Sequence, residues 1–196
     1  MRDMRAKQLF AVKKVKMVQG KRLRSKEAML QEVAILKQLQ HSHVVACHDH
    51  FLDAVDKHVF IVQDYCDRGS LHEHILTKQR GYFSEDNIMR WFVQLALAIQ
   101  YIHGLKILYR DIKASNVFLM HTRTLKLGDF GISKVLDSTV ELASTFVGTP
   151  YYMSPEFCEG MLYSSKADIW VLGCLLFELC TLQPPFEGFS LIGPVS

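Results

Sequence analysis

Residues 109–116 read Tyr-Arg-Asp-Ile-Lys-Ala-Ser-Asn, and Asp129-Phe130-Gly131 follows, with its acid eighteen positions (129 − 111) after Asp111. A carboxylate close to an amide, with a second carboxylate further on, is an arrangement suited to phosphoryl transfer. Asp111 would accept or orient the proton of an attacking hydroxyl, and Lys113 would steady the transferred phosphoryl group. Asn116 and Asp129 offer the hard oxygen ligands that Mg²⁺ prefers and would hold the metal against nucleotide phosphates. Either motif alone also occurs by chance in turns, so the order of further motifs decides the interpretation.

The composition is that of a globular domain. The chain has 196 residues, 49% hydrophobic and 22% charged, which excludes a disordered or collagen-like chain. The 23 Lys and Arg residues against 20 Asp and Glu give a net charge of only +3, so we expect neither nucleic acid nor an anionic membrane as a partner. The apolar run 169–177 is shorter than the roughly 20 residues of a membrane span, and no secretory signal is predicted at the start. Five widely spaced cysteines without a Cys-x-x-Cys pair predict reduced thiols in the cytosol or nucleus.

Alternation and helical spacing predict strands early in the chain and helices later. In residues 9–15, alternation places Lys13 on a strand face among apolar neighbours. Ser25 is a candidate N-cap for an amphipathic helix that ends by His41, and residues 58–64 are rich in strand-forming types. Ser84 starts a long helix toward Gly104, after which short apolar runs at 106–108, 117–120 and 125–127 follow the pattern of strands. We therefore predict an α+β fold of two lobes, with a hinge at residues 64–67.

Five motifs occur in an order that resembles eukaryotic protein kinases. The segments around Asp111 and Asp129 look like the catalytic loop and the metal-binding motif of that family. Ala11-Val12-Lys13 resembles its strand-lysine motif, and Glu32, nineteen positions on (32 − 13), resembles the glutamate that pairs with this lysine. Residues 148–156, Gly-Thr-Pro-Tyr-Tyr-Met-Ser-Pro-Glu, resemble the end of an activation segment, with wording closest to the NIMA-related serine/threonine kinases. An electrostatic argument independently supports the pairing of Lys13 with Glu32, because an ammonium on an apolar strand face needs an anionic partner.

The resemblance implies how a nucleotide would bind. Lys13, paired with Glu32, would hold the α- and β-phosphates of ATP. The backbones of Asp64 and Cys66 would meet the edge of the adenine, beside Gln63 at the gatekeeper position. The implied activity is transfer of the γ-phosphate of Mg-ATP to Ser and Thr hydroxyls of protein substrates.

The resemblance also implies a regulatory site and a cellular setting. Thr145 would carry an activating phosphate, which Arg110 would receive. Asp168, in Asp168-Ile169-Trp170, would brace the backbone of the catalytic loop from the helix that follows it. The implied location is the cytoplasm, with the nucleus and the centrosome or cilium as further sites.

The chain departs from this family at both ends. Family members begin with a Gly-rich strand pair over the nucleotide phosphates, whereas here Gly20 is the only glycine before Gly69. The resemblance ends near Glu187, before the last helices of the large lobe. We therefore expect a partial small lobe (1–63), the hinge (64–67), a partial and mainly helical large lobe (68–187), and a divergent tail (188–196). Without the phosphate lid, Mg-ATP should bind weakly and transfer should be slow.

Other functions remain open at this point. A non-catalytic kinase-like interaction module would keep the large-lobe surface without clamping ATP, and a small-molecule phosphotransferase would act on metabolites. Paired histidines such as His41 and His43 suggest zinc, but irregular spacing without a matched Cys or carboxylate set is more typical of solvated histidines. The basic stretch 21–26 is more typical of a solvated loop than of a nucleic-acid site. The sequence decides neither the protein substrate nor the oligomeric state.

Overall fold

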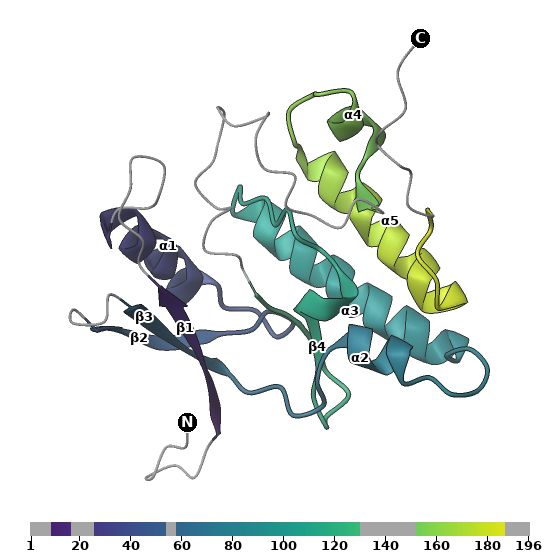
Figure 1. Ribbon diagram of the computed structural model, residues 1–196, viewed down its shortest axis with the longest axis horizontal. Helices are drawn as coiled ribbons and strands as arrows, with labels where there is room; N and C mark the ends of the chain where they lie inside the picture. Colours follow the sequence, from purple (N-terminus) through teal and green to yellow (C-terminus); the bar gives the residue numbers. More distant parts are fainter. Residues whose placement is uncertain (1–8, 17–25, 54–57, 130–151, 187–196) are drawn as a thin grey trace.

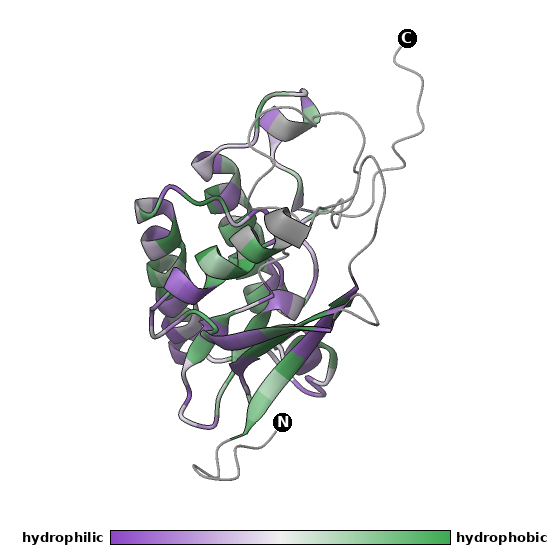
Figure 2. Ribbon diagram, turned by 90° about the vertical axis from the view of Figure 1, so that its left-hand side faces the viewer, coloured by the Kyte–Doolittle hydropathy of each residue, from purple (hydrophilic) through white to green (hydrophobic). Residues whose placement is uncertain are grey.

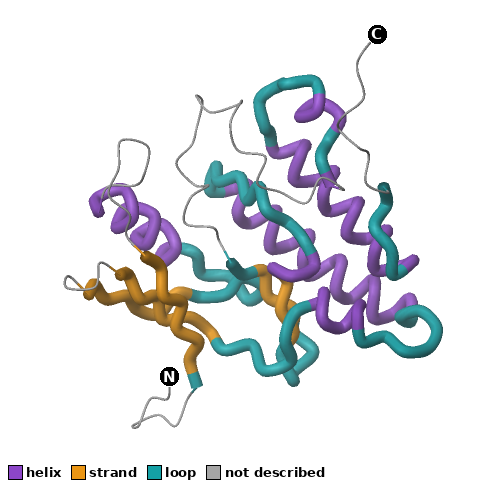
Figure 3. The backbone as a smooth tube through the Cα atoms, viewed as in Figure 1, coloured by secondary structure: helices purple, strands orange, loops and turns teal. Residues whose placement is uncertain are grey.

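The computed structural model describes residues 9–16, 26–53, 58–129 and 152–186. Strands gather on one side of the molecule and most helices on the other, as Figure 3 shows. A three-stranded sheet with one helix comes first in the chain, and the remaining helices with a short hairpin follow. This confirms the predicted α+β fold with a sheet-containing small lobe and a mainly helical large lobe.

The small lobe is an antiparallel sheet covered by one helix. Strands β1 (Phe10–Lys16), β2 (Cys47–Asp53) and β3 (His58–Asp64) lie in the order β1-β3-β2, and helix α1 (Lys26–Gln38) lies beside them (Figure 1). Lys13 pairs with Ile61 in the register, and Ile61 is fully buried in the core cluster together with Val33 of α1. Since opposite residues share a face, Lys13 lies on the face with apolar neighbours, as predicted.

A connector, residues 64–70, joins the lobes and begins with the last residue of β3. β3 ends at Asp64, and helix α2 (Leu71–Leu76) begins after Ser70. Ser70 forms a capping box: its hydroxyl accepts the Glu73 N–H at 3.3 Å, and its own N–H donates to Glu73 Oε2 at 3.0 Å. The cap fixes where α2 starts, so the connector is held at both ends. The predicted hinge, residues 64–67, falls in this segment.

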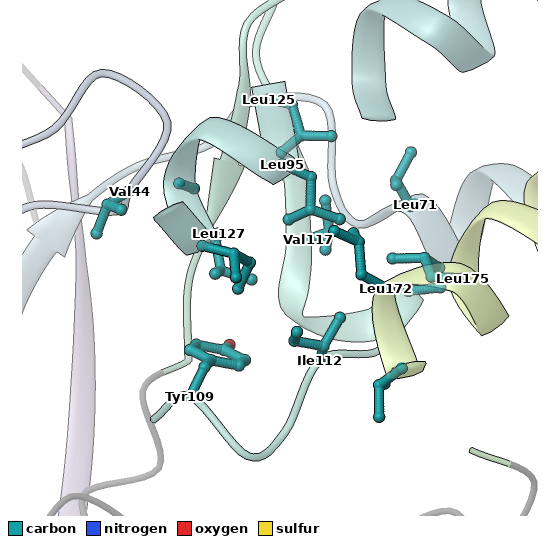
Figure 4. Close-up of a cluster of buried hydrophobic side chains, with 14 of the residues drawn as sticks. Val44, Leu71, Leu95, Tyr109, Ile112, Val117, Leu125, Leu127, Leu172 and Leu175 are labelled. Atoms are coloured by element: carbon teal, nitrogen blue, oxygen red, sulfur yellow. The ribbon is translucent and has the colours of Figure 1, made fainter. Parts of the chain in front are cut away.

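The large lobe packs two long helices against a hairpin. Helices α3 (Glu85–Gly104) and α5 (Ser165–Thr181) enclose apolar side chains with strands β4 (Val117–Leu119) and β5 (Leu125–Leu127). Figure 4 shows Leu95 of α3, Leu125 of β5 and Leu172 of α5 in this cluster. Green and purple segments alternate along the helices in Figure 2, as expected where one helix face packs on a core. The remaining helices are a 3₁₀ turn η1 (Ala114–Asn116) and the short α4 (Pro155–Cys158).

The structure differs from the sequence-based expectation in three segments. Residues 106–108 form no strand, because Lys106 has a positive φ of 62° and the chain turns there at the end of α3. β2 was not predicted, because His48, Asp49 and His50 hide the apolar alternation of an edge strand. α5 starts at Ser165, so Asp168 lies inside this helix rather than before it. The predicted cap Ser25 lies outside the described residues.

None of the helices in the described parts of the chain is long and apolar enough to cross a membrane.

Candidate active site

The segment between α3 and η1 has no regular secondary structure, and Asp168 of α5 holds its backbone. This carboxylate is fully buried, and it accepts the backbone N–H of Tyr109 at 3.0 Å and of Arg110 at 2.9 Å. Arg110 has a φ of 66°, in the left-handed region that non-glycine residues rarely adopt. A buried anion that receives two adjacent N–H groups holds this backbone in place. The predicted bracing role of Asp168 is therefore confirmed.

Two further side chains, those of His103 and Tyr163, contact the Asp168 carboxylate. His103 Nε2 lies 2.7 Å from Asp168 Oδ2, and the Tyr163 hydroxyl donates to Asp168 Oδ1 at 2.7 Å. Burial raises the pKa of Tyr163 above its ordinary value, and the Asp168 carboxylate acts in the same direction. The contacts of His103 and Tyr163 were not predicted, since only the fold brings the end of α3 and the start of α5 together.

Asp111, Lys113 and Asn116 form a polar cluster. Asn116 is buried, and its Nδ2 donates to the Asp111 carbonyl at 2.8 Å and to Asp111 Oδ2 at 3.0 Å. Lys113 Nζ lies 3.2 Å from the same Asp111 Oδ2. The 3₁₀ turn η1 brings Asn116 back toward Asp111, which explains the contact across five positions. The cluster therefore fixes one carboxylate between an amide and a cation.

Tyr109 and Gly128 connect this cluster to Asp129. The Tyr109 hydroxyl donates to the Gly128 carbonyl, and the Gly128 N–H donates to the Asn116 carbonyl at 2.9 Å. Burial raises the pKa of Tyr109 well above its ordinary value, and the charges of Asp111 and Asp129 raise it further. A Cβ at position 128 would come within 2.6 Å of Val45 Cγ2, so only glycine fits without a shift of its neighbours. These bonds hold Gly128, the residue before Asp129, against Tyr109 and Asn116.

Lys13 forms an ion pair with Asp129, across 116 positions of sequence. The contact joins the small lobe to the residue after Gly128. Asp129 has a φ of 52°, a second left-handed residue at this site. Glu32 lies in α1, but its side chain is outside the described residues, so the predicted Lys13–Glu32 pair stays a prediction.

A cavity of about 320 Å³ lies between the sheet, the connector and the hairpin. Nine residues line it: Ala11, Lys13, Val45, Gln63, Asp64, Tyr65, Cys66, Phe118 and Asp129. Apolar walls with one cation and two acids suit a ligand with a flat base and a phosphate tail. Burial raises the pKa of the Cys66 thiol to about 11, and the charge of Asp64 adds to this. The three residues predicted to line a nucleotide base, Gln63, Asp64 and Cys66, all border this cavity.

Some of the predicted site residues lie outside the described residues. Thr145, Phe130 and Gly131 are outside the described residues, and so is the start of the segment 148–156. Glu156, at the end of that segment, is half-buried in α4. The guanidinium of Arg110 lies 5.8 Å from the centre of the Tyr163 ring, a cation–π contact.

The histidine pairs make contacts of other kinds. His41 stacks on Tyr101 with ring centres 4.9 Å apart, and His43 Nδ1 lies 3.1 Å from the Leu125 carbonyl. Within the parts of the chain that the structure describes, no three His, Cys, Asp or Glu side chains gather as metal ligands. These histidines therefore join α3 and β5 to the end of α1.

The chain is similar to known proteins. A family profile described as "Protein kinase domain" matches residues 1–191. The human serine/threonine-protein kinase Nek5 is 50% identical over 171 residues, which is 86% of this chain and 24% of that protein. Mouse Nek1 is 49% identical over 160 residues, 82% of this chain and 13% of that protein, and human Nek2 is 44% identical over 172 residues, 84% and 39%. The chain thus spans well under half the length of these relatives, and their names confirm the predicted resemblance to NIMA-related kinases.

Proposed function

The chain belongs to the protein kinase domain family, and we propose that it is a serine/threonine protein kinase that transfers the γ-phosphate of Mg-ATP to Ser and Thr hydroxyls of proteins. One observation supports this above all. The bonds through Tyr109, Gly128 and Asn116 join the Asp111 cluster to Asp129, which pairs with Lys13 at the cavity. The residues proposed as base, metal ligands and phosphate-binding cation are thus part of one connected network of contacts.

The residues present fit a nucleotide. A volume of about 320 Å³ is within the range of small-molecule sites, and Ala11, Val45 and Phe118 provide apolar walls for a base. The backbones of Asp64 and Cys66 would hydrogen-bond the edge of the adenine. Lys13 would hold the α- and β-phosphates. When the carboxylate of Asp129 binds a metal ion, Glu32 would replace it as the ion-pair partner of Lys13. The protein kinase family generally uses ATP and Mg²⁺, and bound Mg-ATP would supply the transferable phosphoryl group and neutralise its charge.

Asp111 is the proposed base. Its carboxylate would accept the proton of the acceptor hydroxyl as the oxygen attacks. The N–H groups of Asn116 orient Asp111, and this leaves the amide oxygen of Asn116 as the atom offered to Mg²⁺, together with the carboxylate of Asp129. Lys113, already beside Asp111, would stabilise the negative charge on the transferred group.

The proposal also includes a regulatory phosphorylation site and a cellular location. A phosphate on Thr145 would pair with Arg110, whose guanidinium the ring of Tyr163 supports. Since Asp168 binds the Arg110 N–H, such a pair would tighten the catalytic loop. We propose action on protein substrates in the cytoplasm, with the nucleus and the centrosome or cilium as further sites.

The test is Mg-dependent transfer of labelled γ-phosphate to a generic protein acceptor, with phosphoamino-acid analysis of the product. Asp111→Asn should lower the rate at least about 100-fold, the scale of general-base catalysis, while the exposed Asp86→Asn should leave it unchanged. Phosphotyrosine as the main product would refute the Ser/Thr assignment. Transfer to metabolites but not to protein would indicate a small-molecule phosphotransferase. Absence of transfer in a folded wild-type sample would refute the proposal and favour an interaction module.

A further inference from the structure

The connector between the lobes carries the backbone that would bind the base, so its position matters for nucleotide affinity. Asp64 is its first residue, and the Asp64 side chain is 16% exposed. Asp64 Oδ2 accepts the Ala46 N–H at 3.0 Å and lies 3.0 Å from Lys126 Nζ. Asp64 Oδ1 lies 2.7 Å from His48 Nε2. Three donors from outside the connector therefore meet on one carboxylate.

His48 reaches Asp64 because of a β-bulge. The pairing of β2 with β3 shifts between Cys47 and Asp49, which makes His48 the extra residue. A bulge re-aims the side chain of the residue that it inserts. The ring of Phe10 packs against the His48 ring edge-to-face, with centres 5.0 Å apart. Both β1 and β2 therefore support the imidazole beside Asp64.

Lys126 connects the same carboxylate to the large lobe. It lies on β5, its side chain is 14% exposed, and its ammonium also donates to the Val44 carbonyl at 3.3 Å. Backbone bonds run alongside this contact: Val45 N–H donates to the Leu127 carbonyl at 2.8 Å, and Leu127 N–H donates to the His43 carbonyl at 2.8 Å. Lys126 thus joins the hairpin of one lobe to the first residue of the connector.

The electrostatics agree with this geometry. Burial alone would raise the pKa of Asp64, but hydrogen bonds from Ala46, His48 and Lys126 outweigh it, and the pKa falls below its ordinary value. The carboxylate is therefore ionised at neutral pH. An ionised carboxylate with hydrogen bonds from two lobes is a strong positional restraint, because charge-assisted bonds are short and directional.

We propose that Asp64, His48 and Lys126 form an interlobe clamp that fixes the connector and thereby sets nucleotide affinity. Asp64, His48 and Lys126 act here as positioning residues, through the contacts that they make with one another. The inference rests on the proposed function, since it assigns the connector to a bound base. With the clamp released, the connector samples several arrangements, and affinity falls in proportion to the fraction that can bind.

The test measures binding of Mg-ADP to the whole chain by calorimetry. Lys126→Met should raise the Kd about five- to tenfold, as expected if the competent connector falls to about a tenth to a fifth of molecules. Lys126→Arg keeps the cation and should restore most of the affinity. Lys37→Met is the matched control: it removes the 3.1 Å pair with Asp49, an exposed contact within the small lobe, and should leave the Kd unchanged. Equal Kd values for wild type and Lys126→Met, with both folded, would overturn the clamp.

Amide hydrogen exchange separates this inference from the proposed function. Peptides covering residues 44–47 and 64–66 should exchange faster in Lys126→Met than in wild type, and no faster in Lys37→Met. If the wild type does not bind Mg-ADP, the proposed function fails and the inference about affinity falls with it. If the wild type binds Mg-ADP and these peptides exchange equally in all variants, the proposed function stands and the clamp is wrong.

Discussion

Asp168 offers the most direct test of how the backbone before Asp111 is held in place. Each of its carboxylate oxygens accepts one backbone N–H and faces one side chain: Oδ1 takes Arg110 and Tyr163, and Oδ2 takes Tyr109 and His103. Asp168→Asn replaces one oxygen with an NH₂ group. The hydroxyl of Tyr163 can rotate to accept from it, and His103 can change tautomer. A backbone N–H cannot reverse, so one buried donor is left without an acceptor.

The predicted loss follows from this geometry. An unsatisfied buried donor costs about 1–3 kcal/mol, and loss of the charge weakens the remaining bonds, so Asp168→Asn should lower the free energy of unfolding by about 2–4 kcal/mol. This is a large share of the roughly 5–15 kcal/mol of a typical domain. Urea unfolding, followed by the fluorescence of Trp91 and Trp170, measures it. Asp86→Asn, at an exposed position, should shift stability by no more than about 0.5 kcal/mol. A loss below about 1 kcal/mol for Asp168→Asn would refute the reasoning.

Three further predictions concern buried or half-buried groups. Tyr152→Phe removes the hydroxyl that donates to Glu178, where both residues are buried, and should cost about 1–3 kcal/mol in urea unfolding; wild-type stability would contradict this. Since burial raises the pKa of Cys66 to about 11, iodoacetamide at about pH 8 should label the exposed Cys158 at least about tenfold faster, and equal rates by mass spectrometry would argue against it. The pKa of Asp64 is lowered in the fold, so its stabilisation is complete above the ordinary value of 3.8 and disappears as pH falls through the folded value. The stability gap between wild type and Asp64→Asn, about 1.5–3 kcal/mol at about pH 7, should therefore close in acid, and a pH-independent gap would be inconsistent with this.

The sequence predicted the parts of the site that depend on local spacing. Asp111 and Asn116 are five positions apart, and a 3₁₀ turn is enough to bring them together. Alternation was enough to orient Lys13, because a strand has two faces and its neighbours on one of them are apolar. Helix α3 followed from an acidic first turn and a continuous apolar stripe.

Contacts between segments that are far apart in the sequence could not be predicted from local spacing or alternation. Nothing in the spacing of His103 and Tyr163 indicates a shared partner 65 and 5 positions away. β2 was missed for a related reason, since His48 and Asp49 have partners that only the tertiary structure supplies. His48 is the clearest case: its role depends on a bulge, and a bulge depends on the register of two strands.

The segment between α3 and η1, which carries Asp111, depends on helix packing more than on its own sequence. Its backbone forms no ladder, so its N–H groups need acceptors from elsewhere, and Asp168 on α5 provides two of these bonds. His103, at the end of α3, contacts the same carboxylate. A shift of α3 against α5 would therefore move the loop and Asp111 together. Substitutions of core residues of these helices, at Leu95 or Leu172 for example, should alter phosphoryl transfer although they lie away from the cavity.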